Sequence, residues 1–204
     1  MPTVLKFISI AAFASKVVFG TAVFADDQGL YGEPVPADAA FIRWVDVGQN
    51  TNRAAFGRDF ADAGIPDQTF TAVSTALLEG ADVGAYYTIV ATADGSYQTI
   101  KEPSRDDTSK VHLILLNAGE APVSLVVPTP ETDVIPATPS SEAKSRSVNP
   151  VSVALAVRSV TTGATLGEFD VALRRGQNMT FAVIGEDVIA IPSAFGPVIA
   201  QEEG

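Results

Sequence analysis

The chain has 204 residues, with 24 acidic against 13 basic side chains and no cysteine. Disulfides and a cysteine nucleophile are therefore excluded, and the net charge of −11 argues against nucleic acid and anionic membranes as partners. Because 47% of the residues are hydrophobic, the composition favours a globular fold over disorder.

Residues 1–25 predict a signal peptide. Lys6 precedes two apolar segments, "FISIAAFAS" and "VVFGTAVFA", and Val23 and Ala25 stand three residues and one residue before the expected cleavage point. An anchoring helix is the alternative, but Lys16 cuts the apolar run below the roughly 18 to 20 residues that a membrane span needs. No later segment is apolar and long enough to span a membrane, so we expect an exported mature chain.

The first half of the mature chain predicts an extended arm followed by strands. The prolines of "LYGEPVP", residues 30–36, disfavour helix and keep this arm extended. "AAFIRW", residues 39–44, and "YYTIVAT", residues 86–92, are rich in β-branched and aromatic residues and predict strands. Asp94-Gly95 is typical of a tight turn between strands, because a type I′ turn needs positive φ at both central positions.

The second half shows apolar residues at every other position. In "VSVALAV", residues 151–157, valine and leucine alternate with serine and alanine, and "FDVALR", residues 169–174, alternates in the same way. This period of two indicates strands with two distinct faces. Residues 128–150 contain five prolines and predict a long Pro/Ser-rich loop.

The two halves resemble one another in the order of their turn residues. Asp46-Val47-Gly48 and Asn117-Ala118-Gly119 each follow an apolar strand, and a glycine precedes a strand threonine by four residues at Gly84 and Gly176. The polar segment "KEPSRDDTSK" separates the halves and is typical of a linker. The sequence therefore predicts an all-β fold of two small antiparallel β-sandwich domains in tandem, joined by a short linker. The expected domains are 26–101, which carries the N-terminal arm, and 110–204, with residues 102–109 between them.

Residues for catalysis or metal binding form no recognisable motif. His112 is the single histidine, and it alternates with apolar residues in a predicted strand, where a solvent-facing or hydrogen-bonded structural role is expected. The acidic pairs at Asp106-Asp107 and at Glu131 and Asp133 lack the spacing of a loop that wraps calcium. We therefore predict no catalytic residue, no metal site and no cofactor.

The aromatic residues offer candidate contacts for a partner or a polymer. Trp44 is the single tryptophan, Tyr86 has a tyrosine neighbour that must face the other side of the strand, and Tyr97 follows a predicted turn. With Tyr31 of the arm, these side chains are candidates for stacking on sugar rings or docking a protein. Packing in the core is the alternative for each.

Four stretches resemble the alginate biosynthesis protein AlgF family. They are "LYG" with the following proline and "FIRW", then "YYTIV", then "DVIP" with "VNPVSVALAV", and then "LRRGQNMTFAVIG". Their order and rough spacing agree with the family over nearly the whole mature chain. Residues 49–80 and the tail after Gly185 have no matching motif.

The resemblance implies a non-catalytic periplasmic adaptor required for O-acetylation of alginate or a similar exported acidic polysaccharide. The implied partners are a periplasmic polysaccharide O-acetyltransferase and a membrane acyltransferase, with alginate as a further candidate ligand. The N-terminal arm is a candidate docking segment. Two alternatives remain open: a carbohydrate-binding module that recognises the polymer directly, and an esterase or transferase, which would need Ser96 or another serine beside His112.

Overall fold

The computed structural model describes residues 34–45, 53–91 and 96–200, and within these ranges it is built from strands, with two short 3-10 turns and no α-helix. The all-β class is therefore confirmed. Among the described residues no helix is long and apolar enough to cross a membrane. The elements are β1 (Ala39–Val45), β2 (Ala54–Ala55), β3 (Arg58–Asp59), η2 (Ala61–Ala63), β4 (Thr69–Ser74), η3 (Thr75–Leu77), β5 (Tyr86–Ala91), β6 (Tyr97–Glu102), β7 (Val111–Asn117), β8 (Val123–Pro128), β9 (Glu131–Thr138), β10 (Glu142–Val148), β11 (Ser152–Ser159), β12 (Thr165–Ala172), β13 (Met179–Ile184), β14 (Asp187–Pro192) and β15 (Ala194–Ile199).

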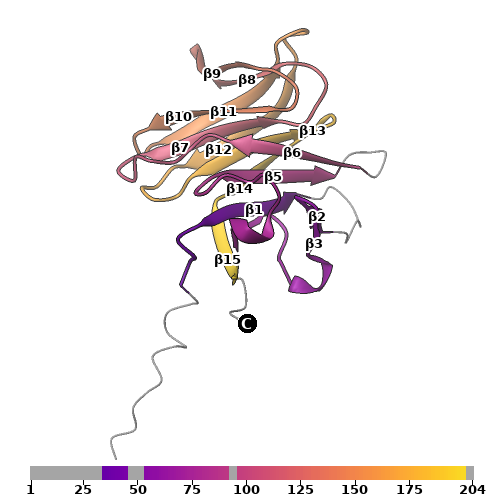
Figure 1. Cartoon of the computed structure of the whole chain (residues 1–204). Coiled ribbons are helices and arrows are strands. Elements are labelled where there is room, and N and C mark those ends of the chain that lie inside the picture. Colours follow the sequence, from indigo (N-terminus) through magenta and orange to yellow (C-terminus); the bar gives the residue numbers. More distant parts are fainter. Residues whose placement is uncertain (1–33, 46–52, 92–95, 201–204) are drawn as a thin grey trace, which may run out of the picture. The chain divides into compact units, whose positions relative to one another are not determined.

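The first sheet has five strands in the order β15-β4-β1-β5-β6. The strand β1 pairs antiparallel with β4 and parallel with β5, so the sheet is mixed rather than purely antiparallel. Its edge strand β15, yellow in Figure 1, comes from the end of the chain and lies among the indigo and purple strands of the first half. The expected second domain, residues 110–204, thus gives its last strand to the first sheet, which the sequence did not reveal.

The second half forms a β-sandwich of two four-stranded sheets, β10-β7-β13-β14 and β12-β11-β8-β9. Both sheets contribute to one apolar core, to which β7 supplies Leu115, β8 Leu125, β11 Leu155 and β13 Phe181. The alternation predicted for the second half therefore sends one face of each strand into this core.

In the first half, the five-stranded sheet is accompanied by the two-stranded sheet β2-β3. One face is covered by the β2–β3 hairpin and the segments around the 3-10 turns, and the other packs against the sheet that contains β7. This second contact joins Val45, Val90 and Ile100 to Leu116 and Ala182. The sheet β10-β7-β13-β14, which we call the central sheet, is thus covered on both faces around β7. This explains why all seven residues of β7 are buried.

The duplicated turn pattern corresponds to duplicated strand pairing. The parallel pair β1–β5 places Thr88 opposite Arg43, and the parallel pair β7–β13 places Thr180 opposite Ile114. Arg43 and Ile114 occupy matching positions, each three residues before the Asx of its turn motif. The glycines before the two threonines both have positive φ, which a residue with a Cβ rarely adopts.

One expectation about a connecting segment was wrong. Residues 128–150 are not a long loop, because they contain the strands β9 and β10. β9 lies at a sheet edge, where Pro136 removes no hydrogen bond from an interior ladder. The segment expected as a linker does connect β6 to β7 without a strand between them, but Glu102 ends β6 and the side chain of Arg105 is buried.

Candidate functional site

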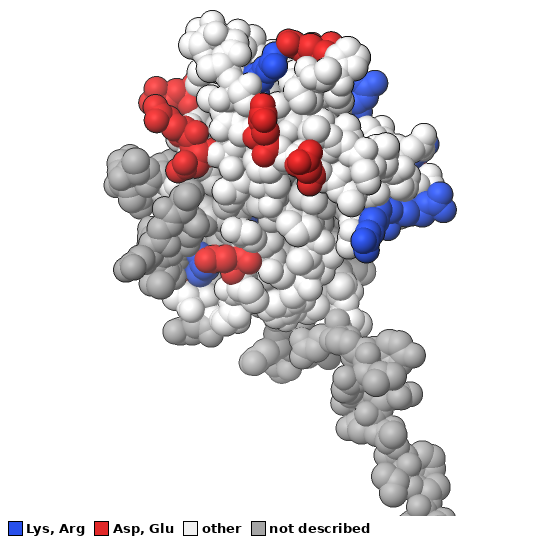
Figure 2. Space-filling model, turned by 180° about the vertical axis from the view of Figure 1, so that it is seen from behind, with Lys and Arg blue, Asp and Glu red and all other residues white. Residues whose placement is uncertain are grey.

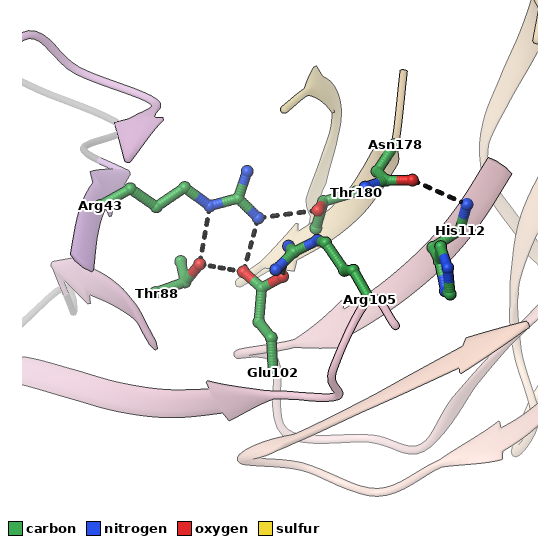
Figure 3. A network of polar contacts seen from close by, with 7 residues as sticks. All are labelled: Arg43, Thr88, Glu102, Arg105, His112, Asn178 and Thr180. Atoms are coloured by element: carbon green, nitrogen blue, oxygen red, sulfur yellow. Dashed lines mark hydrogen bonds and ion pairs between the residues drawn. The ribbon is translucent and has the colours of Figure 1, made fainter. Parts of the chain in front are cut away.

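A buried polar network lies between the first sheet and the central sheet (Figure 3). Arg43 on β1 and Thr88 opposite it on β5 point toward the end of β6, where Glu102 stands. The Nε of Arg43 donates to the Thr88 hydroxyl at 2.8 Å, and this hydroxyl in turn donates to Oε1 of Glu102. The Thr88 hydroxyl thus accepts one hydrogen bond and donates another, which fixes the positions of Arg43 and Glu102 relative to each other.

Arg43 also connects the two layers. Its Nη2 donates to Oε1 of Glu102 at 2.6 Å and to the hydroxyl of Thr180, on β13 of the central sheet, at 2.7 Å. The side chains of Arg43 and Glu102 are both 0% exposed. Burial lowers the pKa of Arg43, and the nearby Glu102 carboxylate opposes that shift. The pair is a desolvated ion pair that depends on its hydrogen bonds.

Arg105, from the segment after β6, supplies a second buried cation. Its Nη2 donates to Oε2 of Glu102 at 2.5 Å, and its guanidinium lies 3.9 Å from the ring centroid of Tyr86 and 4.9 Å from that of Phe70. The guanidinium of Arg43 lies 4.5 Å from the centroid of the same Phe70 ring. Contact with the faces of aromatic rings suits guanidinium, which is weakly hydrated. The Nε and Nη1 atoms of Arg105 are buried and find no acceptor among the described residues.

An aromatic surface lies beside this network. Phe41 and Tyr86 stack with centroids 4.8 Å apart, and Phe195 of β15 meets them edge-on at 5.8 and 6.4 Å. Phe195 is 58% exposed, whereas Phe70 beneath it is fully buried. We call Phe41, Tyr86 and Phe195 the aromatic surface. Aromatic and arginine side chains at a well-packed site are typical of the residues that dominate protein interfaces.

The four aromatic candidates from the sequence have separate positions in the structure. Tyr86 belongs to the aromatic surface. Trp44 is 0% exposed and packs on Phe60 in the core under the β2–β3 hairpin, so its proposed role in stacking on a ligand is wrong. Tyr97 is partly buried against that same core, and Tyr31 lies outside the described residues.

Phe195 and Arg105 were not among the residues predicted from the sequence. Phe195 lies in the tail that had no matching motif, and Arg105 lies in the segment interpreted as a linker. Neither carries a local signal, because each takes its role from strand pairing or stacking with residues far away in the sequence.

His112, at the start of β7, has a partner at each ring nitrogen. Nε2 lies 3.0 Å from the backbone oxygen of Asp107, and Nδ1 lies 3.3 Å from the hydroxyl of Ser147 on β10. Its backbone N–H donates to the side chain of Asn178, as Figure 3 shows. The serine beside this histidine is Ser147 rather than Ser96. Within the described ranges no three His, Asp or Glu side chains gather in a way that would hold a metal ion.

The charges on one face of the molecule are scattered. Figure 2 shows Asp and Glu side chains over several parts of this face, with Lys and Arg side chains mainly toward one side. They do not form a continuous basic track on this face, such as a long polyanion would follow.

Comparisons with known proteins agree on one family. The family model described as "Alginate O-acetyl transferase AlgF" matches residues 14–180. The chain is 27% identical over 162 residues to the alginate biosynthesis protein AlgF of Pseudomonas aeruginosa, with 74% of this chain and 71% of that protein covered. It is 25% identical over 193 residues to the protein of the same name from Pseudomonas fluorescens, covering 87% of each chain. For the Pseudomonas syringae pv. tomato protein the identity is 24% over 206 residues, with 95% and 92% covered.

Among solved structures, the C-terminal domain of AlgF from P. aeruginosa matches with a TM-score of 0.36 and 22% identity. The match covers 42% of this chain and 97% of that domain.

Proposed function

Because the chain belongs to the alginate O-acetyl transferase AlgF family, we propose that it is a periplasmic adaptor for O-acetylation of alginate or a similar exported acidic polysaccharide. In this role it binds a periplasmic polysaccharide O-acetyltransferase and a membrane acyltransferase, which transfer the acetyl group. The relatives are named as alginate biosynthesis proteins, and this supports a place in the same process.

The aromatic surface is the observation that carries the proposal. It combines a 58% exposed Phe195 with partly buried Phe41 and Tyr86, and Arg105 stacks on Tyr86 from the buried side. Such a surface presents apolar area on a preorganised base, so few side chains have to be ordered when a partner binds. An adaptor that holds two partners raises the effective concentration of one near the other.

A carbohydrate-binding module remains the second candidate, because an exposed aromatic ring can also stack on sugars. The buried position of Trp44 removes one of the residues on which that reading rested. The two functions are distinguished by the ligand: the module binds alginate oligosaccharides directly, whereas the adaptor binds the acetyltransferase.

The test is capture of the periplasmic acetyltransferase from the same gene cluster by the immobilised mature chain. We expect binding by the wild type and a loss of about 30-fold or more in affinity for Phe195→Ser, the factor that corresponds to an interface hot spot of about 2 kcal/mol. Val160→Ser is the matched control, because Val160 is also an exposed apolar residue, 48% exposed, and directly follows β11 of the sheet β12-β11-β8-β9, away from the first sheet.

Two results would overturn parts of the proposal. If the wild type captures no acetyltransferase and a deletion strain acetylates its polymer normally, the adaptor role is wrong. If Phe195→Ser and Val160→Ser bind equally well, the contact surface lies elsewhere. Calorimetric titration of the wild type with alginate oligosaccharides checks the second candidate, since heat of binding without capture of the enzyme would favour the module.

A further inference from the structure

Ser147 and His112 form a side-chain pair across neighbouring strands. They stand directly opposite each other in the antiparallel pairing of β10 with β7. The backbone N–H of His112 points away from β10, because it donates to the side chain of Asn178 on the far side of β7. In an antiparallel ladder, opposite residues whose N–H groups point outward are the close pair, with side chains nearest to each other. This explains the 3.3 Å between the Ser147 hydroxyl and Nδ1 of His112.

The partners of the ring determine where its proton lies. The backbone oxygen of Asp107 can only accept, so Nε2 of His112, 3.0 Å away, must carry a proton. In the neutral ring Nδ1 then holds a lone pair and accepts from the Ser147 hydroxyl. The result is a nucleophile, a base and a group that orients the base, which is the arrangement that activates a serine.

The exposure of the two residues suits this chemistry. Ser147 is exposed, while His112 is 6% exposed and held at both nitrogens. Because β10 is an edge strand and Ser147 belongs to a close pair, the backbone N–H of Ser147 points away from β7 at the edge of the sheet. A backbone N–H of the nucleophilic residue is a donor that serine enzymes use to stabilise the oxyanion.

We propose that Ser147 accepts an acetyl group from an activated acetyl donor, a thioester or an ester, with His112 as the general base. The Ser147 oxygen attacks the acetyl carbonyl carbon while its proton moves to Nδ1 of His112. The bond from the carbonyl carbon to the sulfur or oxygen of the donor breaks, and the leaving group takes that proton as a thiol or alcohol. An acceptor hydroxyl reverses these steps and takes the acetyl group. This goes beyond the adaptor role, which needs no covalent step.

The first experiment uses the mature chain and p-nitrophenyl acetate as the acetyl donor. We expect a mass gain of one acetyl group that maps to the peptide with Ser147. Acylation there should fall about 100-fold or more in His112→Gln and vanish in Ser147→Ala, since general-base catalysis contributes about that factor. Ser145→Ala is the matched control, because Ser145 lies on the same face of β10 but opposite Ile114. Acetyl found only on lysines, or equal labelling of the Ser147 peptide in His112→Gln, would overturn the proposal.

A second experiment covers the case in which His112→Gln fails to fold. The chain has no cysteine, so Ser147→Cys and Ser145→Cys each carry a single thiol. A thiol beside a histidine has a lowered pKa. We expect alkylation of Ser147→Cys by iodoacetamide to persist to lower pH than that of Ser145→Cys. Superimposable pH profiles would contradict the pairing. Capture of the acetyltransferase by Ser147→Ala should match the wild type, so failure of the acetyl-accepting role leaves the adaptor role standing.

Discussion

The two faces of the first sheet differ in chemistry although the same strands build both. On β1, Ile42 and Trp44 enter the apolar core beneath the β2–β3 hairpin. Arg43 between them faces the central sheet and is as deeply buried as its neighbours. One face therefore depends on apolar packing, and the middle of the other depends on an ion pair with three hydrogen bonds from Arg43.

This difference shows that a polar residue at an alternate strand position is not evidence of a solvent-facing side. The period of two holds along β1, but it separates two buried environments instead of core from water. A buried ion pair adds little over an apolar replacement of the same shape, yet removing one partner is costly because the other charge stays desolvated. The two faces should therefore respond differently to substitution.

The largest effect is expected at Glu102. Glu102→Gln keeps the size of the side chain but leaves Arg43 and Arg105 buried without a counter-charge. We expect a loss of about 3–5 kcal/mol in the free energy of unfolding, measured by urea denaturation. Glu131→Gln is the matched control, since Glu131 pairs with Arg158 at the surface with its side chain 63% exposed. The loss in unfolding free energy for Glu131→Gln should stay below about 1 kcal/mol. Equal losses for the two variants would refute the central role of the buried network.

The apolar face should be more tolerant of a single change. Trp44→Phe removes an N–H that has no acceptor among the described residues and leaves a small gap beside Phe60. We expect a loss of about 1–3 kcal/mol, less than that of Glu102→Gln, in the same urea measurement. If Trp44→Phe loses more unfolding free energy than Glu102→Gln, the apolar face is the more sensitive of the two and the expected order is wrong.

Sequence patterns predicted much of the fold because β-strand signals are local. Enrichment in β-branched and aromatic residues located β1 and β5, alternation located β11 and the second half of β12, and the family resemblance drawn from four motifs was confirmed. The matching turn glycines predicted that the two halves are alike, and β1–β5 and β7–β13 do share one kind of pairing, although it is parallel and not the antiparallel pairing that was expected.

The remaining features depend on contacts between residues that are far apart in the chain. Nothing near Phe195 shows that β15 will join the first sheet, and the polar sequence around Arg105 is the same whether it is a free linker or a buried cation. The prolines of residues 128–150 suggested a loop because proline is rare in interior strands, but β9 is an edge strand. The pair of His112 and Ser147 required the register of β10 against β7, which the sequence did not specify.

The smallest expected effect lies where the first sheet meets solvent. Asp38, just before β1, accepts a hydrogen bond of 2.7 Å from Ser74 at the end of β4. This bond is the main cause that lowers the pKa of Asp38 below its ordinary value of 3.8. Because the pKa is lower in the folded state, the carboxylate contributes stability above pH 3.8, and the contribution is lost as the pH falls through the folded pKa.

Ser74→Ala tests this directly, because it removes the donor and brings the folded pKa of Asp38 back toward its unfolded value. The variant has a constant cost from losing the bond between Ser74 and the backbone of Ala76, which does not change with pH. The difference in unfolding free energy between wild type and variant should therefore shrink as the pH falls from about 6 to about 3. Asp82 and Asp107, whose pKa values are also lowered, are present in both proteins and cancel in this difference. Asp38→Asn should show the same convergence, whereas parallel stability curves for all three proteins would mean that Ser74 does not hold the Asp38 carboxylate in solution.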